Sequence, residues 1–160
     1  MTEELLQECR RYVESGGLLS GSRFTPVRIT HRRLAQIDAG AAADWVEGNK
    51  GQPFTQLLFA YIDRTGKPDS TIYKKAYIDR RLFSKIRSNK NYIPAKKTVL
   101  ALCLALELPR AEADSLLASA GYSLSSAEEY DLVIAFCMEK KIFNFMDINE
   151  LLDHFGMEIF

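Results

Sequence analysis

Apolar residues recur at helical spacing along most of the 160-residue chain. Between Phe54 and Ile62, for example, apolar side chains return every three or four residues, which places them on one face of an α-helix. No segment alternates strictly between apolar and polar residues, as a half-buried strand would. The pattern therefore predicts an all-α protein of seven to nine helices.

Turn-forming residues and caps divide this pattern into segments. Gly66 can close the helix that starts at Phe54, Asp79 can cap another, and the sequence from Ser125 to Glu128 has the form of a capping box. The eight apolar residues from Val99 to Leu106 predict a central helix that is buried nearly all round. The expected helices cover residues 3–14, 32–46, 54–66, 69–77, 79–87, 96–106, 109–121, 125–138 and 147–155.

The cluster of turn-forming residues from Gly48 to Pro53 predicts the main boundary in the chain. A chain of this length is typical of one domain with an appended arm. We expect residues 1–52 to form an N-terminal helical arm, with a linker over residues 16–31, and residues 53–160 to form the main domain.

The arm has apolar residues with which it can attach to something. Trp45 with Val46, and the Leu18–Leu19 pair, are the anchors. They allow the arm to pack on its own domain, to bind a partner or to join two copies in a homodimer, and the arm can also be a linker that remains from a fused ancestor. The sequence leaves these uses open.

Basic and acidic residues are equal in number, 21 each, but they are unevenly distributed. Residues 1–73 carry nine of each kind, residues 74–97 carry nine basic and one acidic, and residues 98–160 carry three basic and eleven acidic. The net charge therefore runs from 0 to +8 to −8 along the chain. A neutral total hides a basic segment beside an acidic one, and either can be an interaction surface.

The basic segment contains two short predicted helices, over residues 69–77 and 79–87, separated by a tight turn. This is the layout of a helix-turn-helix, in which apolar contacts hold the second helix across the first and its outer face enters the DNA major groove. Arg80 and Arg81 lie in the first turn of the second helix, where the helix dipole disfavours each exposed cation by roughly 0.3 to 1 kcal/mol. We therefore expect a role for them other than helix stability.

The candidate nucleic-acid contacts are of two kinds. Side chains on the outer face of the basic helix 79–88 can meet base edges, and flanking basic residues can meet phosphates. The candidate set is Arg80, Arg81, Ser84, Lys85, Arg87, Lys90, Lys96 and Lys97. The alternative is a solvated basic face that the acidic C-terminal helices balance.

Two resemblances accompany these residues. The segment from Phe54 to Gly121 resembles the Cro and phage-repressor class of helix-turn-helix proteins, through Ile72-Tyr73 to Ile78-Asp79 and Phe83-Ser84-Lys85-Ile86. More closely, residues 73–89 resemble the signature of a bacterial all-helical accessory domain, which is often found C-terminal to macrodomain or other enzymatic modules in Gram-positive bacteria. The second resemblance covers about two thirds of the chain and implies an all-helical fold, without implying a defined activity.

Two positions depart from the repressor pattern. Tyr77 stands where the turn usually has glycine, which tolerates a positive φ, so the geometry of the turn is open. Asp69 stands where repressors commonly have a glutamine that meets a phosphate, and a carboxylate would be repelled there.

Catalysis has little support in the sequence. The chain has no nucleophile-elbow, dinucleotide-binding or P-loop pattern. The neighbouring acids Glu128, Glu129 and Asp131 lie near a predicted helix start, where the dipole stabilises them, and we interpret them as caps and surface residues. We therefore expect no enzymatic activity and no cofactor.

The residues that commonly bind metals are isolated from one another. His31 and His154 have no partner at a metal-binding spacing. Cys9, Cys103 and Cys137 are far apart in apolar stretches, which predicts buried thiols rather than a disulfide or a metal site. We expect no bound metal.

No membrane segment is expected. The first residues lack the basic and apolar regions of a signal peptide, and the longest apolar run is far shorter than the ~20 residues that cross a bilayer. These features predict a cytoplasmic protein.

Two functions are consistent with these patterns. The first is a non-enzymatic regulator that binds double-stranded DNA through the basic helix 79–88. The second is a protein-interaction or adaptor module with a helix-turn-helix-like fold and no DNA binding. Salt-dependent binding to duplex DNA distinguishes the two.

Overall fold

The computed structural model describes residues 3–14 and 39–160. These residues form nine helices and no strand, which confirms the prediction of an all-α protein with seven to nine helices. The helices are α1 (Glu3–Glu14), α2 (Ala39–Gly48), α3 (Phe54–Thr65), α4 (Asp69–Lys75), α5 (Arg80–Ser88), α6 (Lys96–Ala105), α7 (Arg110–Ser119), α8 (Glu129–Glu139) and α9 (Phe145–His154). The expected linker over 16–31, and residues 32–38 of the second expected helix, lie outside the described residues.

The chain divides into two compact units. One contains α1 together with α3 to α9, and the other contains α2. Helix α1, which the sequence assigns to the arm, packs against α8 and so belongs to the same unit as α3 to α9. Helix α2 ends at Gly48 and α3 begins at Phe54, at the two ends of the predicted cluster of turn-forming residues.

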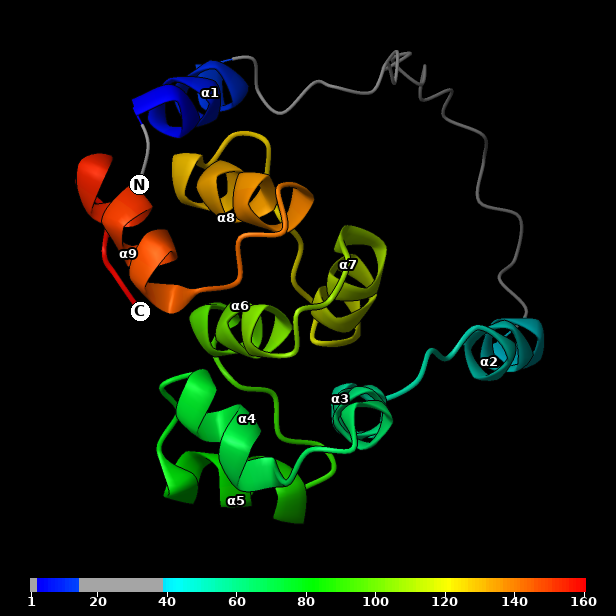
Figure 1. Ribbon diagram of the computed structural model, residues 1–160. Coiled ribbons are helices and arrows are strands. Elements are labelled where there is room, and N and C mark those ends of the chain that lie inside the picture. Colours follow the sequence, from blue (N-terminus) through cyan, green and yellow to red (C-terminus); the bar gives the residue numbers. More distant parts are fainter. Residues whose placement is uncertain (1–2, 15–38) are drawn as a thin grey trace, which may run out of the picture. The chain divides into compact units, whose positions relative to one another are not determined.

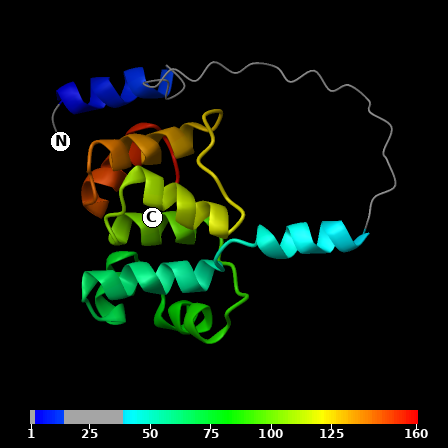
Figure 2. The same ribbon diagram turned by 90° about the vertical axis from the view of Figure 1, so that its right-hand side faces the viewer.

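Two helices form the centre of the larger unit. Every residue from Val99 to Leu106, in and just after α6, is buried, as the continuous apolar run predicts. Every residue of α8 from Asp131 to Met138 is buried as well. Within this unit, α1 lies beyond α8 at one end, and α4 and α5 lie beyond α6 at the other (Figures 1 and 2). The basic helix α5 is therefore the outermost element of its end.

Five helices, α4 and α6 to α9, end with the same hydrogen-bonded motif. A residue just after each helix has a positive φ, and the amide of the next residue donates to a carbonyl five residues earlier, at 2.8–3.0 Å. This is the Schellman arrangement, in which the donating residue also packs an apolar side chain on the helix. Those donating residues are Ile78, Leu108, Tyr122, Ile142 and Met157.

The predicted capping box before α8 is wrong. No side chain caps the first turn of α8, and the Ser125 hydroxyl instead accepts a hydrogen bond from the Ala127 amide at 3.1 Å. The carboxylate of Asp131, in the first turn of the helix, accepts from the Ser125 amide at 2.7 Å. Asp131 is only 3% exposed, so its interpretation as a surface residue is also wrong.

Candidate nucleic-acid interface

The segment between α4 and α5 is a tightly bonded turn. Tyr77 has a φ of 54°, so a tyrosine adopts the left-handed conformation that glycine usually adopts at such a position. The Ile78 amide donates to the Tyr73 carbonyl at 2.8 Å, which fixes the turn on α4. The Asp79 carboxylate accepts from the Arg81 amide, so the predicted cap of α5 is confirmed.

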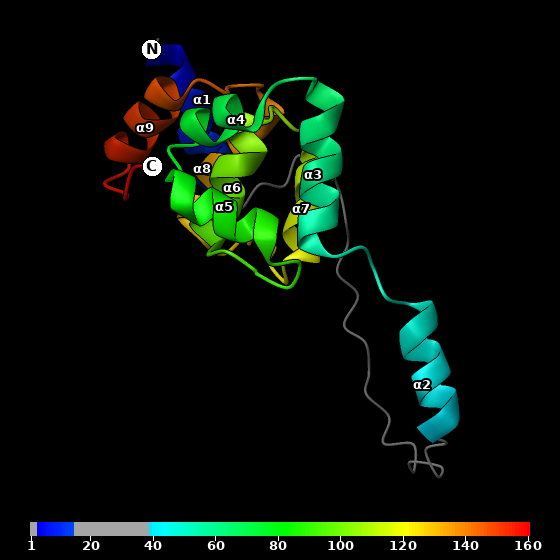
Figure 3. The same cartoon turned by 90° about the horizontal axis from the view of Figure 1, so that it is seen from below.

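Two buried side chains anchor α5 to the rest of the unit. Phe83 and Ile86 are 3% and 0% exposed. The Phe83 ring packs against Phe59 of α3 edge-on, with centroids 6.0 Å apart, and against Tyr73 of α4 at 5.4 Å. Because Phe83 and Ile86 face inward, the opposite face of α5 is directed away from the core. Figure 3 views the unit from this side.

The outward face of α5 brings together four of the predicted site residues. Arg80, Arg81, Ser84 and Lys85 are all exposed. Within the described part of the chain, the side chains of Arg80, Arg81 and Ser84 have no hydrogen-bond or ion-pair partner. The Lys85 ammonium lies over the Tyr92 ring, 4.3 Å from its centroid. This face therefore presents two unpaired guanidinium groups and one exposed ammonium group to solvent.

Arg87 and Lys90 flank this face on the side of α3. Arg87 pairs with Asp69 at 2.5 Å and lies over the Phe59 ring, 4.4 Å from its centroid. Asp69 therefore neutralises Arg87, and it does not cap α4. The Lys90 carbonyl accepts from the Thr55 hydroxyl at 3.0 Å, which ties the loop after α5 to α3. A pocket of about 430 Å³ opens between these elements, and Arg87 and Lys90 line it.

Lys96 and Lys97 face the acidic C-terminal region. Lys96 forms an ion pair with the buried carboxylate of Asp131. Lys97 pairs with Glu158 at 2.7 Å and donates to the Ile159 carbonyl at 2.8 Å. Both lysines are therefore paired with acidic or carbonyl groups of the C-terminal elements, unlike Arg80 and Arg81 on the outward face of α5.

Two lysines on α4 lie beside the turn. Lys75 pairs with Glu107 at 2.6 Å, and this hydrogen bond is the main cause that lowers the pKa of Glu107. Lys74 is exposed, and it has no ion-pair partner among the described residues. Lys74 therefore adds a free positive charge to this end of the unit.

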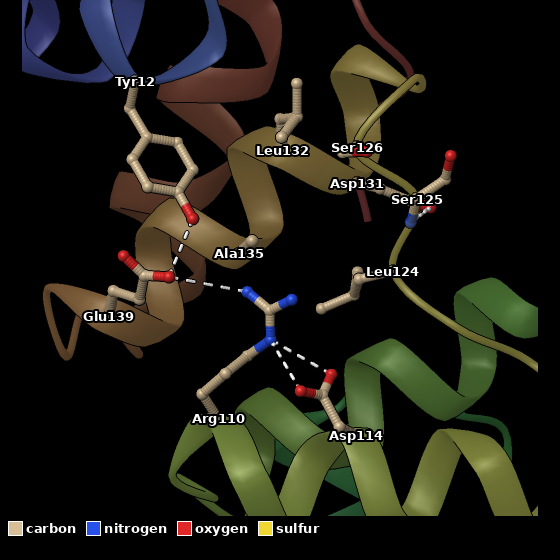
Figure 4. Close-up of a pocket in the computed structure, with 10 residues that line it drawn as sticks. All are labelled: Tyr12, Arg110, Asp114, Leu124, Ser125, Ser126, Asp131, Leu132, Ala135 and Glu139. Atoms are coloured by element: carbon tan, nitrogen blue, oxygen red, sulfur yellow. Dashed lines mark hydrogen bonds and ion pairs between the residues drawn. The ribbon is translucent and has the colours of Figure 1, made fainter. Parts of the chain in front are cut away.

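A polar pocket of about 260 Å³ lies at the opposite end, between α1, α7 and α8 (Figure 4). The Tyr12 hydroxyl donates to Glu139 at 2.7 Å, and the Arg110 guanidinium lies 3.6 Å from the same carboxylate. Arg110 also donates to Asp114 at 3.0 Å. Burial, followed by the hydrogen bond to Glu139, raises the pKa of Tyr12 to about 12. Because three distant helices supply these groups, no local pattern in the sequence could indicate the pocket.

The three thiols are buried, as predicted, and burial raises their pKa values. The pKa is about 11 for Cys9 and about 12 for Cys103 and Cys137. The thiols are therefore protonated at neutral pH, whereas the thiolate is the reactive form. Across residues 3–14 and 39–160, no three His, Cys, Asp or Glu residues are grouped as metal ligands. The helices of this described part are too short or too polar to cross a bilayer.

The geometry defines a helical unit that presents a basic helix at one end. The expected resemblances to phage repressors and to the accessory domain extend over more of the chain and include that same end, through residues 72–89. The chain matches no protein-family model, and no curated protein or solved structure is significantly similar to it.

Proposed function

We propose that the chain is a non-enzymatic regulator that binds double-stranded DNA, with α5 as the helix that enters the major groove. The observation that carries the proposal is the state of Arg80 and Arg81. Both are exposed and unpaired in the first turn of a helix, where the helix dipole disfavours cations. A ligand rich in phosphate oxygens and guanine acceptors would offset this unfavourable placement.

The proposed core is a helix-turn-helix made of α4, the turn and α5. Four residues join the two helices, and the turn contains a positive φ, as turns in this motif commonly do. Apolar contacts from Phe83 to α3 and α4 support the second helix and leave its basic face free. These features support the motif together with its docking geometry.

Each side chain has a role in the proposal. Arg80, Arg81 and Ser84 lie where the start of the helix would contact base edges. Lys85, Lys90 and Lys74 would contact phosphates on either side. Lys96 and Lys97 are already paired with acidic or carbonyl groups, so we do not include them among the proposed DNA contacts. Arg87 lies beside the basic face, but its guanidinium group is already paired with Asp69, so we assign it no contact of its own.

The test is fluorescence anisotropy of a labelled random-sequence duplex across ~50 to 200 mM salt. We expect binding that weakens steeply with salt, and we expect Arg80→Glu/Arg81→Glu to abolish it. The matched control is Arg10→Glu/Arg11→Glu, which reverses two adjacent exposed arginines on α1, at the other end of the unit.

The results of this experiment distinguish binding through α5 from a general charge effect and from a loss of folding. The melting temperature of the α5 variant should not fall, because acidic residues suit the first turn of a helix. Equal loss of binding in both variants would show a general charge effect and remove α5 as the site. No binding by the wild-type chain at the lowest salt would reject the proposal.

One observation favours the alternative of a protein-interaction module. Helix α2 exposes Trp45 by 67% and Val46 by 50%. A ten-residue helix is marginally stable in water unless its apolar side chains pack on something. Copurification of one specific protein that survives nuclease and high salt, and that is lost in Trp45→Ala, would support this function.

A further inference from the structure

Arg87 differs from the other two arginines of α5. Its Nη2 atom lies 2.5 Å from Oδ2 of Asp69, whereas the side chains of Arg80 and Arg81 have no partner among the described residues. Asp69 is in the first turn of α4, and Arg87 is in the last turn of α5. The side chains of this pair are 32% and 53% exposed, and exposed ion pairs contribute little to stability. The pair therefore calls for a reason other than the stability of the fold.

A second contact fixes the position of the Arg87 guanidinium. Its carbon atom Cζ lies 4.4 Å from the centroid of the Phe59 ring of α3. Phe59 itself packs edge-on against the buried ring of Phe83, so it is a firm support. Arg87 is thus held by α3 and α4 together, while half of its side chain stays in contact with solvent. A charged group that is both fixed and accessible is well placed to meet a ligand.

The pocket of about 430 Å³ beside Arg87 is suited to an anion. Arg87 and Lys90 line it, and no acidic residue of the described part of the chain does. The Lys90 ammonium has no ion-pair partner among these residues. The hydroxyl of Thr55, a residue that is only 5% exposed, donates to the Lys90 carbonyl at 3.0 Å and so fixes the backbone at the edge of the pocket. Lysine and arginine are the side chains that commonly contact DNA phosphates.

The Asp69 carboxylate and a phosphate group have the same chemistry toward Arg87. Each offers negatively charged oxygens that accept strong hydrogen bonds from a guanidinium group. While Asp69 is bound, it neutralises the charge of Arg87, and it would repel a phosphate that approached the same group. The salt dependence of DNA binding reports the number of phosphates that a protein neutralises. A carboxylate at this position therefore removes one phosphate contact from the basic end of the unit.

We propose that Asp69 is an internal competitor of DNA phosphate for Arg87 and so limits the affinity of this chain for DNA. The inference rests on the DNA binding by α5 that is proposed above. It concerns the sequence-independent part of that binding, because phosphate contacts carry no sequence information. Asp69 acts through Arg87 and contacts no DNA itself. Without the Asp69 charge, Arg87 joins Lys90 at the pocket and adds one phosphate contact.

Fluorescence anisotropy of a labelled random-sequence duplex across ~50 to 200 mM salt tests the competition. Asp69→Asn should lower the Kd by ~3- to 10-fold at ~50 mM salt, and the slope of log affinity against log salt should become steeper by about 0.9. Asp69→Glu keeps a carboxylate and should bind DNA like the wild type. Asp63→Asn is the matched control, because it makes the same change of net charge at an exposed carboxylate of α3 that has no ion-pair partner among the described residues. It should change the Kd by less than roughly 2-fold.

A double variant tests whether the gain in affinity depends on Arg87. In Asp69→Asn/Arg87→Ala the released group is absent, so the Kd and the salt slope should return to those of the wild type. A gain that persists in the double variant would overturn the inference.

The remaining outcomes separate this inference from the proposed function. A wild-type chain that binds DNA, together with an Asp69→Asn variant that binds no more tightly, would overturn the inference and leave the proposed function standing. An equal gain in Asp69→Asn and Asp63→Asn would show a general charge effect and would overturn the inference in the same way. Absence of binding by both the wild type and Asp69→Asn at the lowest salt would overturn both.

Discussion

Lys96, in the first turn of α6, forms an ion pair with the carboxylate of Asp131, which is almost completely buried at the start of α8. The Ser125 amide donates to the same carboxylate oxygen at 2.7 Å. A residue of the basic segment and a residue of the acidic segment are thus joined inside the unit. The basic and acidic segments, which are separate in the sequence, therefore neutralise part of each other's charge in the folded protein.

Lys96→Met should destabilise the protein by about 3 kcal/mol, the low end for breaking a buried pair, because Lys96 is itself about a third exposed. The variant leaves a buried carboxylate with one amide donor. Lys96→Met/Asp131→Asn should recover most of the loss, since the asparagine carbonyl can still accept from Ser125. Urea unfolding measures both. Lys74→Ala, at an exposed unpaired lysine, is the control and should change the free energy of unfolding little. If Lys96→Met changes it as little as the control does, the ion pair does not stabilise the protein.

Local patterns in the sequence predict most of the fold. Helices form wherever the apolar spacing is helical, and Asp79 caps α5 because its carboxylate reaches an amide only two residues away. The continuous run from Val99 to Leu106 predicts burial on all sides because no polar face is available. Each of these features depends on residues that are close together in the chain.

The candidate site was less predictable because long-range packing decides it. Arg80, Arg81, Lys96 and Lys97 are alike in sequence, yet two are unpaired and two are paired with residues at least 35 positions away. The pairing of the buried Asp131 depends in the same way on a residue of α6, Lys96, that is 35 positions away in the chain. An acid near a helix start has the same sequence pattern whether it is exposed or buried.

Some basic residues are unpaired and others are held in ion pairs, and the two groups should contribute differently to the salt dependence of DNA binding. Lys90→Ala should lower the slope of log affinity against log salt by about one, because a free ammonium near the phosphates is lost. Lys97→Ala should leave the slope unchanged, because Lys97 is held by Glu158 and the Ile159 carbonyl. Anisotropy titrations at several salt concentrations give both slopes. If Lys97→Ala lowered the slope and Lys90→Ala did not, Lys97 would have to leave its partners to contact DNA.

The left-handed residues after the helices predict a stabilising substitution. Lys141 has a φ of 57° and an exposed side chain without a partner among the described residues. Lys141→Gly should raise the free energy of unfolding by about 1 kcal/mol, because glycine has no side chain to strain this conformation. Lys141→Ala, which keeps the strain, should change little. Gly121→Ala, at a φ of 76°, should lower stability, and urea unfolding compares all three.

Two tyrosines should respond in opposite ways to loss of the hydroxyl group at neutral pH. Tyr12→Phe removes a hydrogen bond to Glu139 and should cost about 1 kcal/mol. Tyr130→Phe removes a buried hydroxyl that has no hydrogen-bond partner, so it should be neutral or stabilising. Thermal unfolding of the two variants at pH 7 provides the comparison. A clear loss of stability in Tyr130→Phe would mean that a bound water or another group satisfies the hydroxyl.

The same two residues predict a loss of stability at alkaline pH. Burial raises the pKa of Tyr12 and of Tyr130 from 10 to about 12, and for Tyr12 the hydrogen bond to Glu139 adds to this. Between these pH values the unfolded chain ionises these phenols while the folded chain keeps them neutral, so the free energy of unfolding falls as pH rises from about 10 to about 12. Below pH 10 both states are protonated and this contribution is constant. Urea unfolding at pH 9 and pH 11 should show a smaller loss in Tyr12→Phe/Tyr130→Phe than in the wild type, and equal losses would mean that both phenols ionise normally in the folded protein.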